Sequence, residues 1–241
     1  MTGTNDVTDD DQHPTIWRRA LPWVPSALTI ANLLCGWAAI VHAVHGDFGG
    51  AVPFIALAIV FDMADGRIAR MTGTASAFGA QLDSLADLVS FGMAPALLAY
   101  QWGLQPLGGI GWLVGFSFLA AAAVRLARFN THPCTDARYF TGLPSPAAAA
   151  LVAATVLMAP DGLHTTRGAL LGIAVVAVPA VLMVSTLRFR SFKTVDVHAW
   201  RTYQLLGVAA IAAAFAVSQP HAAFVVVAYA YLSSAFIELV V

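Results

Sequence analysis

Long apolar stretches separated by short turns run through most of this chain. Glycine and proline, which favour turns, lie between the stretches, as at Gly49-Gly50 and Gln219-Pro220. A membrane-spanning helix needs about 20 predominantly apolar residues. Eight stretches approach that length, at residues 25–45, 51–70, 82–101, 108–127, 145–160, 168–187, 202–218 and 220–239. The pattern predicts an all-α, polytopic membrane helix bundle with about eight transmembrane helices.

The N-terminal segment has a different pattern. Residues 1–14 contain four aspartates and few apolar side chains, which predicts a disordered acidic tail. Residues 15–24 hold two tryptophans and two arginines. Tryptophan prefers the headgroup region and arginine the cytoplasmic leaflet, so we expect an interfacial amphipathic helix here. Residues 25–241 then form the transmembrane domain.

Composition strengthens the membrane prediction. Of the 241 residues, 59% are hydrophobic and only 10% are charged, whereas an ordinary soluble domain has about 25% charged residues. The net charge of −1 provides no field that would recruit nucleic acid. Cys35 and Cys134 are far apart in the sequence, and they predict neither a disulfide framework nor a metal site.

The basic residues predict the orientation, because lysine and arginine concentrate in cytoplasmic loops. With eight spans and a cytoplasmic N-terminus, only Arg167 of the twelve basic residues falls outside. The other eleven fall on the cytoplasmic side: Arg18, Arg19, Arg67, Arg70, Arg125, Arg128, Arg138, Arg188, Arg190, Lys193 and Arg201. We therefore expect an integral cell-membrane protein with its N-terminus in the cytoplasm.

Two pairs of aspartates lie at the cytoplasmic ends of the second and third predicted spans. Asp62 and Asp65 are three residues apart, and Asp83 and Asp87 are four apart, so each pair shares one helix face. A hairpin at 72–77 would bring the two faces together. Four carboxylates so close would repel one another unless a cation lay among them. Oxygen ligands without histidine or cysteine favour Mg²⁺ or Mn²⁺.

Glycine and arginine flank these carboxylates. Gly66 and Gly79 would let a bulky ligand approach the metal face closely. Arg70 can bind a phosphate through two parallel hydrogen bonds. Together these residues indicate a diphosphate substrate at a two-metal site, where a spare carboxylate takes the proton of an attacking hydroxyl.

The spacing resembles the signature of the CDP-alcohol phosphotransferase family, D-x2-D-G-x2-A-R-x8-G-x3-D-x3-D. All fixed positions are met, by Asp62, Asp65, Gly66, Ala69, Arg70, Gly79, Asp83 and Asp87. The resemblance implies transfer of a phosphatidyl or similar group from a CDP-linked donor to an alcohol, with release of CMP.

The same resemblance implies a role for each residue of the motif. Asp62, Asp65 and Asp83 would ligate two Mg²⁺ or Mn²⁺ ions, and Asp87 would contact the second ion and act as the base. Gly66 and Arg70 would hold the CDP moiety. Further residues expected at the CDP-diacylglycerol site are Ala69, Gly79, Ser76, Asn32 and Thr29.

Residues flanking the motif bear on the acceptor alcohol. The stretches 29–36, 79–95 and 125–130 with 140–146 are similar to the phosphatidylserine synthase branch of the family. Two spans after a six-helix family core also suit that branch. The expected substrates are CDP-diacylglycerol and L-serine, in a membrane-lipid environment, and a homodimer is a further expectation from the family. A sister transferase that uses glycerol 3-phosphate or inositol phosphate is the alternative, and a divalent-metal transporter is a more remote one.

Other polar residues have weaker signals. Arg125 and Arg128 share a helix face and would bind the carboxylate of serine or the phosphates of the donor, or serve only as membrane anchors. Ser84 and Ser90 either reach the site or make bonds within their helix. The remaining polar residues are expected at membrane interfaces: His42 and His45 opposite the carboxylates, and Arg188, Arg190, Lys193 and Glu238 on the cytoplasmic side.

Overall fold

The computed structural model describes most of the chain up to residue 190. The described residues are 23–74, 76–131, 139–163, 165–185, 188–190, 225–226 and 228–229. The predicted acidic tail and most of the predicted interfacial helix lie outside them. So do the predicted spans at 202–218 and 220–239, except for the four residues at 225–226 and 228–229, which are helical. Cys134, Lys193 and Glu238 also lie outside the described residues.

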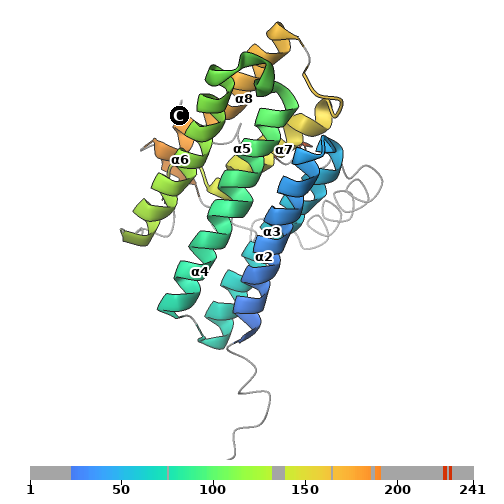
Figure 1. Ribbon diagram of the computed structural model, residues 1–241. Coiled ribbons are helices and arrows are strands. Elements are labelled where there is room, and N and C mark those ends of the chain that lie inside the picture. Colours follow the sequence, from blue (N-terminus) through green and yellow to red (C-terminus); the bar gives the residue numbers. More distant parts are fainter. Residues whose placement is uncertain are drawn as a thin grey trace, which may run out of the picture.

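Helices make up almost all of the described structure (Figure 1). The first half of the chain contains α2 (Trp23–Val44), α3 (Phe48–Thr72), α4 (Ala77–Asp87), the π-helical η1 (Leu88–Met93) and α5 (Ala94–Ala99). The second half contains the π-helical η2 (Tyr100–Leu104), the 3₁₀ helix η3 (Gln105–Leu107), α6 (Gly109–Thr131), α7 (Ser145–Met158) and α8 (Thr166–Val184).

Five stretches of the described residues are long and apolar enough to cross a membrane. They are α2, α3, the continuous stretch Ala77–Leu107, α6, and Arg167–Val184 within α8. The first four and the sixth of the predicted spans are therefore confirmed as long apolar helices. The chain is an integral membrane protein.

Local capping explains the predicted hairpin between α3 and α4. The helix α3 ends at Thr72 and is capped by Gly73, whose φ of +64° is a left-handed conformation that glycine adopts without strain. The hydroxyl of Ser76 then accepts a hydrogen bond from the Gly79 amide at 3.0 Å and caps the start of α4. The hairpin is confirmed: it reverses the chain between α3 and α4, and α2 packs against both helices.

The third span is longer than the predicted 82–101, because Gly103 and Pro106, residue types that often end a helix, do not end this one. Gly103 lies in η2, closely packed against Leu163, whose amide donates to the Trp102 carbonyl at 2.7 Å. Pro106 lies in the first turn of η3, where the missing amide hydrogen of proline costs little. Helical structure therefore continues to Leu107 through two π-helical segments.

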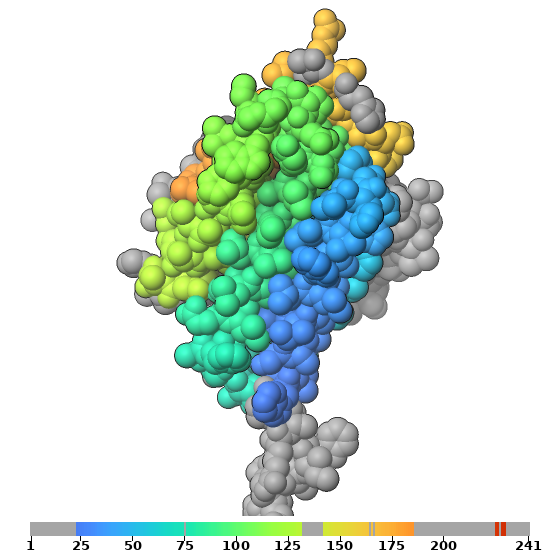
Figure 2. Space-filling model, viewed as in Figure 1, coloured from blue at the N-terminus to red at the C-terminus, as the bar shows by residue number. Residues whose placement is uncertain are grey.

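The helix α7 lies at the centre of the bundle. Its Ala149, Ala153 and Val156 pack with α2, α3 and α5, whereas its Leu151 and Val152 pack with α6 and α8. The predicted span 145–160 forms a 14-residue helix, shorter than the membrane-spanning length. Since protein rather than lipid covers α7, the thickness of the bilayer does not set its length. Figure 2 shows α2, α4 and α6 on the outside of the molecule.

A short antiparallel ribbon departs from the all-α expectation. β1 (Tyr139–Thr141) pairs with β2 (Arg188–Arg190), with Phe140 opposite Phe189. Next to it, the Leu143 amide donates to the Leu182 carbonyl at 3.0 Å. The ribbon thus joins the segment that enters α7 to the segment that leaves α8, a long-range pairing that hydrophobic patterning does not reveal.

Candidate active site

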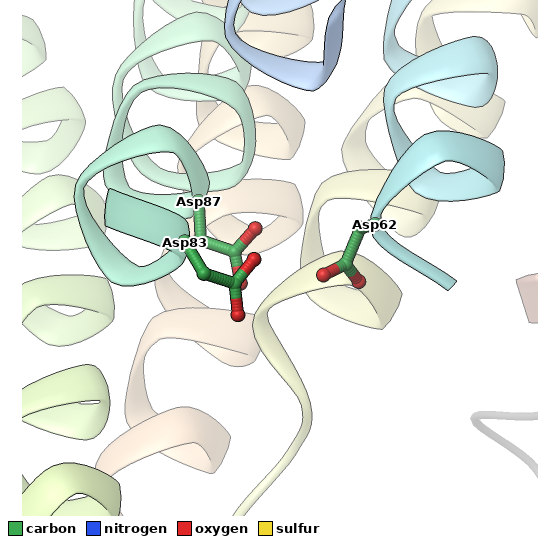
Figure 3. Close-up of side chains that lie close together, drawn as sticks. All are labelled: Asp62, Asp83 and Asp87. Atoms are coloured by element: carbon green, nitrogen blue, oxygen red, sulfur yellow. The ribbon is translucent and has the colours of Figure 1, made fainter. Parts of the chain in front are cut away.

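Three carboxylates from two helices face one another within the bundle (Figure 3). Asp62 comes from α3, and Asp83 and Asp87 come from successive turns of α4. One oxygen of each lies within 4.8 Å of one oxygen of the other two. The hairpin makes this possible, because it reverses the chain between α3 and α4 so that their carboxylates face one another.

Asp87 is held from a third helix. The Asn32 side-chain amide, on α2, donates to Asp87 Oδ1 at 3.1 Å, and both residues are buried. The hydroxyl of Ser90 donates to the backbone carbonyl of Asn32 at 3.0 Å. A Cβ on Gly36 would lie only 2.4 Å from Ser90 Oγ, so the glycine permits the close approach of α2 to η1. These contacts fix Asn32 relative to the helix that carries Asp87.

Asp65 lies apart from the other three carboxylates, although the spacing predicts one cluster of four. Its Oδ2 lies 2.8 Å from the Thr29 hydroxyl, which also lies 3.0 Å from the Pro25 carbonyl and can donate its one hydrogen to either acceptor. The Asp65 charge still acts on Asp62, Asp83 and Asp87. The structure therefore brings three of the four together and turns the fourth towards α2.

The three facing carboxylates fit a hard divalent cation. Asp83 Oδ1 and Asn32 Oδ1 are buried and have no hydrogen-bond partner among the described residues. A buried oxygen without a partner is costly, and a cation bound between the carboxylates would satisfy Asp83. The three candidate ligands are carboxylates, the donor type that Mg²⁺ and Mn²⁺ prefer.

The glycine and arginine of the motif lie on α3 near the carboxylates. A Cβ on Gly66 would meet only the Arg70 guanidinium, at 3.9 Å, so this face of α3 is otherwise open among the described residues. Arg70 is exposed and Ala69 is half-buried beside it. On α4, Gly79 is half-buried next to the capping Ser76, whose hydroxyl lies 3.2 Å from where a Gly79 Cβ would be.

Two predicted arginines of α6 contact other helices. Arg125 donates to the hydroxyl of Ser145, the first residue of α7, at 3.0 Å, and its charge also acts on Asp62. Arg128 donates to the Val184 carbonyl, at the end of α8, at 3.3 Å. Arg125 thus lies within electrostatic range of the carboxylates.

Sequence reasoning missed two partners and left the serines of α4 and η1 undecided. Ser145 is fully buried; its place between Pro144 and Pro146 indicated a helix start but no partner. The Asn130 amide donates to the Ser84 hydroxyl oxygen at 2.9 Å, and that hydroxyl can donate its one hydrogen either to Asn130 Oδ1 at 3.3 Å or to the Ala80 carbonyl of its own helix at 3.0 Å. Ser90 bonds α2.

The opposite end of the bundle holds the two predicted interfacial histidines. His42 Nδ1 lies 2.7 Å from Asp47 Oδ2, and His45 Nδ1 lies 2.7 Å from the Val41 carbonyl. A cavity of about 260 Å³ also lies at this end, between Gly46, Phe48 and Trp102. None of the four motif aspartates lines it.

Comparisons with known proteins agree with the motif. A sequence model of the CDP-alcohol phosphatidyltransferase family matches residues 22–187. The chain is 38% identical over 174 residues to a CDP-diacylglycerol–serine O-phosphatidyltransferase of Helicobacter pylori, covering 71% of this chain and 73% of that protein. It is 34% identical over 217 residues to the Mycobacterium tuberculosis protein of the same name, covering 87% and 75%. An archaetidylserine synthase of Methanothermobacter thermautotrophicus is 34% identical over 168 residues, covering 69% of each chain.

Proposed function

Because the chain belongs to the CDP-alcohol phosphatidyltransferase family, we propose that it transfers the phosphatidyl group of CDP-diacylglycerol to the hydroxyl of L-serine. The products are phosphatidylserine and CMP. The observation that carries the acceptor is the name shared by its relatives, whose similarity extends over 71% and 87% of this chain. The facing carboxylates of α3 and α4 support the reaction type.

The chemistry is a displacement at phosphorus. The serine oxygen forms a bond to the phosphorus that carries diacylglycerol, and the bond from that phosphorus to the oxygen bridging to CMP breaks. The hydroxyl proton goes to a carboxylate, and CMP leaves with the bridging oxygen. Asp87 is the proposed base, as the family resemblance implies, and the Asn32 amide that donates to it restrains the position of its carboxylate.

Asp62, Asp65, Asp83 and Asp87 would hold Mg²⁺ or Mn²⁺, with two ions per site. When bound, the ions polarise the phosphoryl oxygens and stabilise the negative charge of the leaving phosphate. For Asp65, the contact between Oδ2 and the Thr29 hydroxyl at 2.8 Å leaves Oδ1 and further lone pairs for an ion.

Residues of α3 and of α6 are the candidates for substrate binding beside the carboxylates. The open face of α3 at Gly66, Ala69 and Arg70 supports a donor site for the CDP diphosphate. Gly79 and Ser76 stay predictions for the same site. On the α6 side, Arg125 lies within range of Asp62, which supports a role with the serine carboxylate or the donor phosphates. Arg128 stays a weaker prediction for the same group.

We also propose that the carboxylates lie on the cytoplasmic side of the cell membrane, as does the N-terminus. Arg67 and Arg70, on α3, and Arg125 and Arg128, on α6, occur in the same halves of their helices as the carboxylate end, whereas Arg167 begins α8 at the opposite end. That asymmetry is the positive-inside pattern. Eight spans in total, a membrane-lipid environment and a homodimer stay predictions.

Acceptor competition tests the proposed function. The purified protein in detergent would receive CDP-diacylglycerol, Mn²⁺ and labelled L-serine, glycerol 3-phosphate or inositol phosphate, first singly and then together. We expect labelled phosphatidylserine and stoichiometric CMP. A product from glycerol 3-phosphate or inositol phosphate in place of serine would identify a sister transferase. Transport of Mn²⁺ into vesicles with no CMP release would support the transporter alternative.

A further inference from the structure

We propose that Thr29 and Asn32 of α2 are positioning residues that hold two of the motif carboxylates in the geometry that binds the metal ions. Thr29 contacts Asp65 and Asn32 contacts Asp87, so one turn of α2 reaches both arms of the motif. The inference rests on the proposed function, because it requires that the motif carboxylates bind metal ions. It assigns Thr29 and Asn32 to these carboxylates and not to the nucleotide.

The two donors are placed as a pair. Thr29 and Asn32 are three residues apart and therefore share one face of α2. Both are almost completely buried, with exposed fractions of 4% and 0%. Their partners come from different helices, since Asp65 lies on α3 and Asp87 on α4. The helix α2 therefore connects the two carboxylate-bearing helices through side-chain hydrogen bonds.

The position of α2 is itself determined by close packing. Ser90 bonds the Asn32 backbone, and the missing side chain of Gly36 leaves room for Ser90 one turn further along. Asn32 is thus fixed through its own main chain as well as its side chain. A donor fixed in this way restricts the rotation of the Asp87 carboxylate.

The chemical type of the donors fits a metal site. A carboxylate offers about four lone-pair sites, so one hydrogen bond leaves others for a cation. A neutral hydroxyl or amide orients the carboxylate without neutralising it, whereas a lysine or arginine in the same place would compete with the ion. Hydrogen-bond partners of metal ligands typically contribute about 10–100-fold in metal affinity or activity.

The test measures the metal alone. Electron paramagnetic resonance of Mn²⁺, titrated into the purified full chain without substrates, gives the dissociation constant. Thr29→Val removes the hydroxyl at nearly constant shape, and Asn32→Leu removes the amide. Thr29→Ser retains the hydroxyl and serves as the rescue variant. Cys35→Ala is the matched control, because Cys35 is buried in the same helix, whereas the α2 side chains that bond the aspartates are Thr29 and Asn32.

We expect Thr29→Val and Asn32→Leu to weaken Mn²⁺ binding by about 10–100-fold, while Thr29→Ser and Cys35→Ala bind as the wild type does. In assays at saturating Mn²⁺, the KM for CDP-diacylglycerol should stay unchanged and kcat should recover towards the wild-type value. If Asn32→Leu does not fold, the difference between Thr29→Val and Thr29→Ser decides.

Three results would overturn the inference. Unchanged Mn²⁺ affinity with a raised KM for CDP-diacylglycerol would assign both residues to the nucleotide. An equal loss of Mn²⁺ binding in Cys35→Ala would show that disturbed packing of α2, and not the loss of the hydrogen bonds to Asp65 and Asp87, causes the effect. A wild-type protein that binds no Mn²⁺ would overturn the proposed metal site itself. Normal Mn²⁺ binding in the wild type and in both variants would instead overturn only the role of Thr29 and Asn32.

Discussion

The helix α3 has an aspartate before its first residue and aspartates in its second half, and the surroundings of these carboxylates differ in exposure and in hydrogen-bond partners. Asp47, just before the helix, is exposed, and both of its oxygens have a partner: Oδ1 accepts from the Gly50 amide at 2.9 Å, and Oδ2 lies 2.7 Å from His42 Nδ1. Near the other end, Asp62 faces Asp83 and Asp87, and Asp83 Oδ1 is buried without a partner among the described residues.

The difference separates a structural carboxylate from a chemical one. Asp47 satisfies a free amide of the first helical turn, which is the ordinary work of an N-cap. The three facing carboxylates, of which Asp87 is buried and Asp62 and Asp83 are half-buried, repel one another and leave hydrogen-bonding capacity unused. This costs free energy unless a cation or substrate occupies the space between them. The residues of the sequence motif and the buried oxygen of Asp83 that lacks a partner occur at the same site. Asp47 is outside the motif, and both of its oxygens have partners.

Loss of Asp83 should have the largest effect. Asp83→Asn removes the charge of the carboxylate whose buried oxygen lacks a partner, so Mn²⁺ should no longer bind. A bound metal supplies several kcal/mol of transition-state stabilisation, and we therefore expect activity to fall by at least about 1,000-fold. Mn²⁺ binding and CMP release check this, and chelation of the wild type should reproduce the loss. Full activity in excess EDTA, with metal removal verified, would contradict it.

Asp87→Asn should separate proton transfer from metal binding. The amide keeps the shape and one oxygen ligand but loses most of the basicity. General-base help is typically worth about 10²–10⁴-fold, so we expect single turnover to slow by at least about 100-fold, with CDP-diacylglycerol binding near normal. The comparison is with Asp83→Asn. Equal loss of donor binding in both variants would make Asp87 chiefly a metal ligand, and a wild-type rate would place the base elsewhere.

Gly36→Ala tests whether the close approach of α2 matters. The new methyl would collide with Ser90 Oγ and backbone Cα, at 2.4 and 2.8 Å from the unshifted position. Overpacking of this kind costs about 1–3 kcal/mol, and the displacement of Asn32 should lower activity as well. Thermal unfolding and CMP release measure the two effects. Gly49→Ala is the control, because a Cβ there meets nothing within 4 Å; equal behaviour of both variants would contradict the prediction.

Arg70→Lys should have a smaller effect, confined to the donor. Lysine keeps the charge but loses the planar fork that binds a phosphate through two hydrogen bonds. A hydrogen bond to a charged group is worth about 1.5–3 kcal/mol, so the KM for CDP-diacylglycerol should rise by about 10-fold or more. The KM for serine should change little. Arg67→Lys, one turn earlier on α3, is the control, and an unchanged donor KM in Arg70→Lys would remove Arg70 from the site.

Local periodicity predicted much of this site. The spacing of Asp83 and Asp87 places them on successive turns of one helix, and Gly73 and Ser76 are residues that end and begin helices, so the facing arrangement follows from the sequence. The bond from Asn32 to Asp87 joins residues 55 apart. The contact of Asp65 with Thr29 joins residues 36 apart. Neither tertiary contact has a local signature.

The helix lengths differ from the prediction for the same reason. A prediction from hydropathy assumes that an apolar helix is surrounded by lipid and matches the thickness of the bilayer. The helix α7 is instead packed among other helices and is only 14 residues long. The ribbon of β1 and β2 joins segments that flank α7 and α8, and its three-residue strands are too short for an alternating pattern to stand out. What surrounds a segment, and not its own composition, decides these features.

Asp47→Asn should have the smallest effect and sharpen the contrast between the ends of α3. Asparagine can still cap the helix, so CMP release and Mn²⁺ binding should equal those of the wild type. The hydrogen bond with His42, then that from the Gly50 amide, hold the pKa of Asp47 below its usual 3.8. A carboxylate whose pKa is lower in the folded than in the unfolded protein stabilises the fold at any pH above the unfolded pKa. This stabilisation is lost as the pH falls through the folded pKa. The wild type should therefore unfold at a slightly higher temperature than Asp47→Asn near neutral pH, and the difference should shrink as the pH drops below 3.8. A loss of activity in Asp47→Asn would show that the carboxylates of the two ends are coupled.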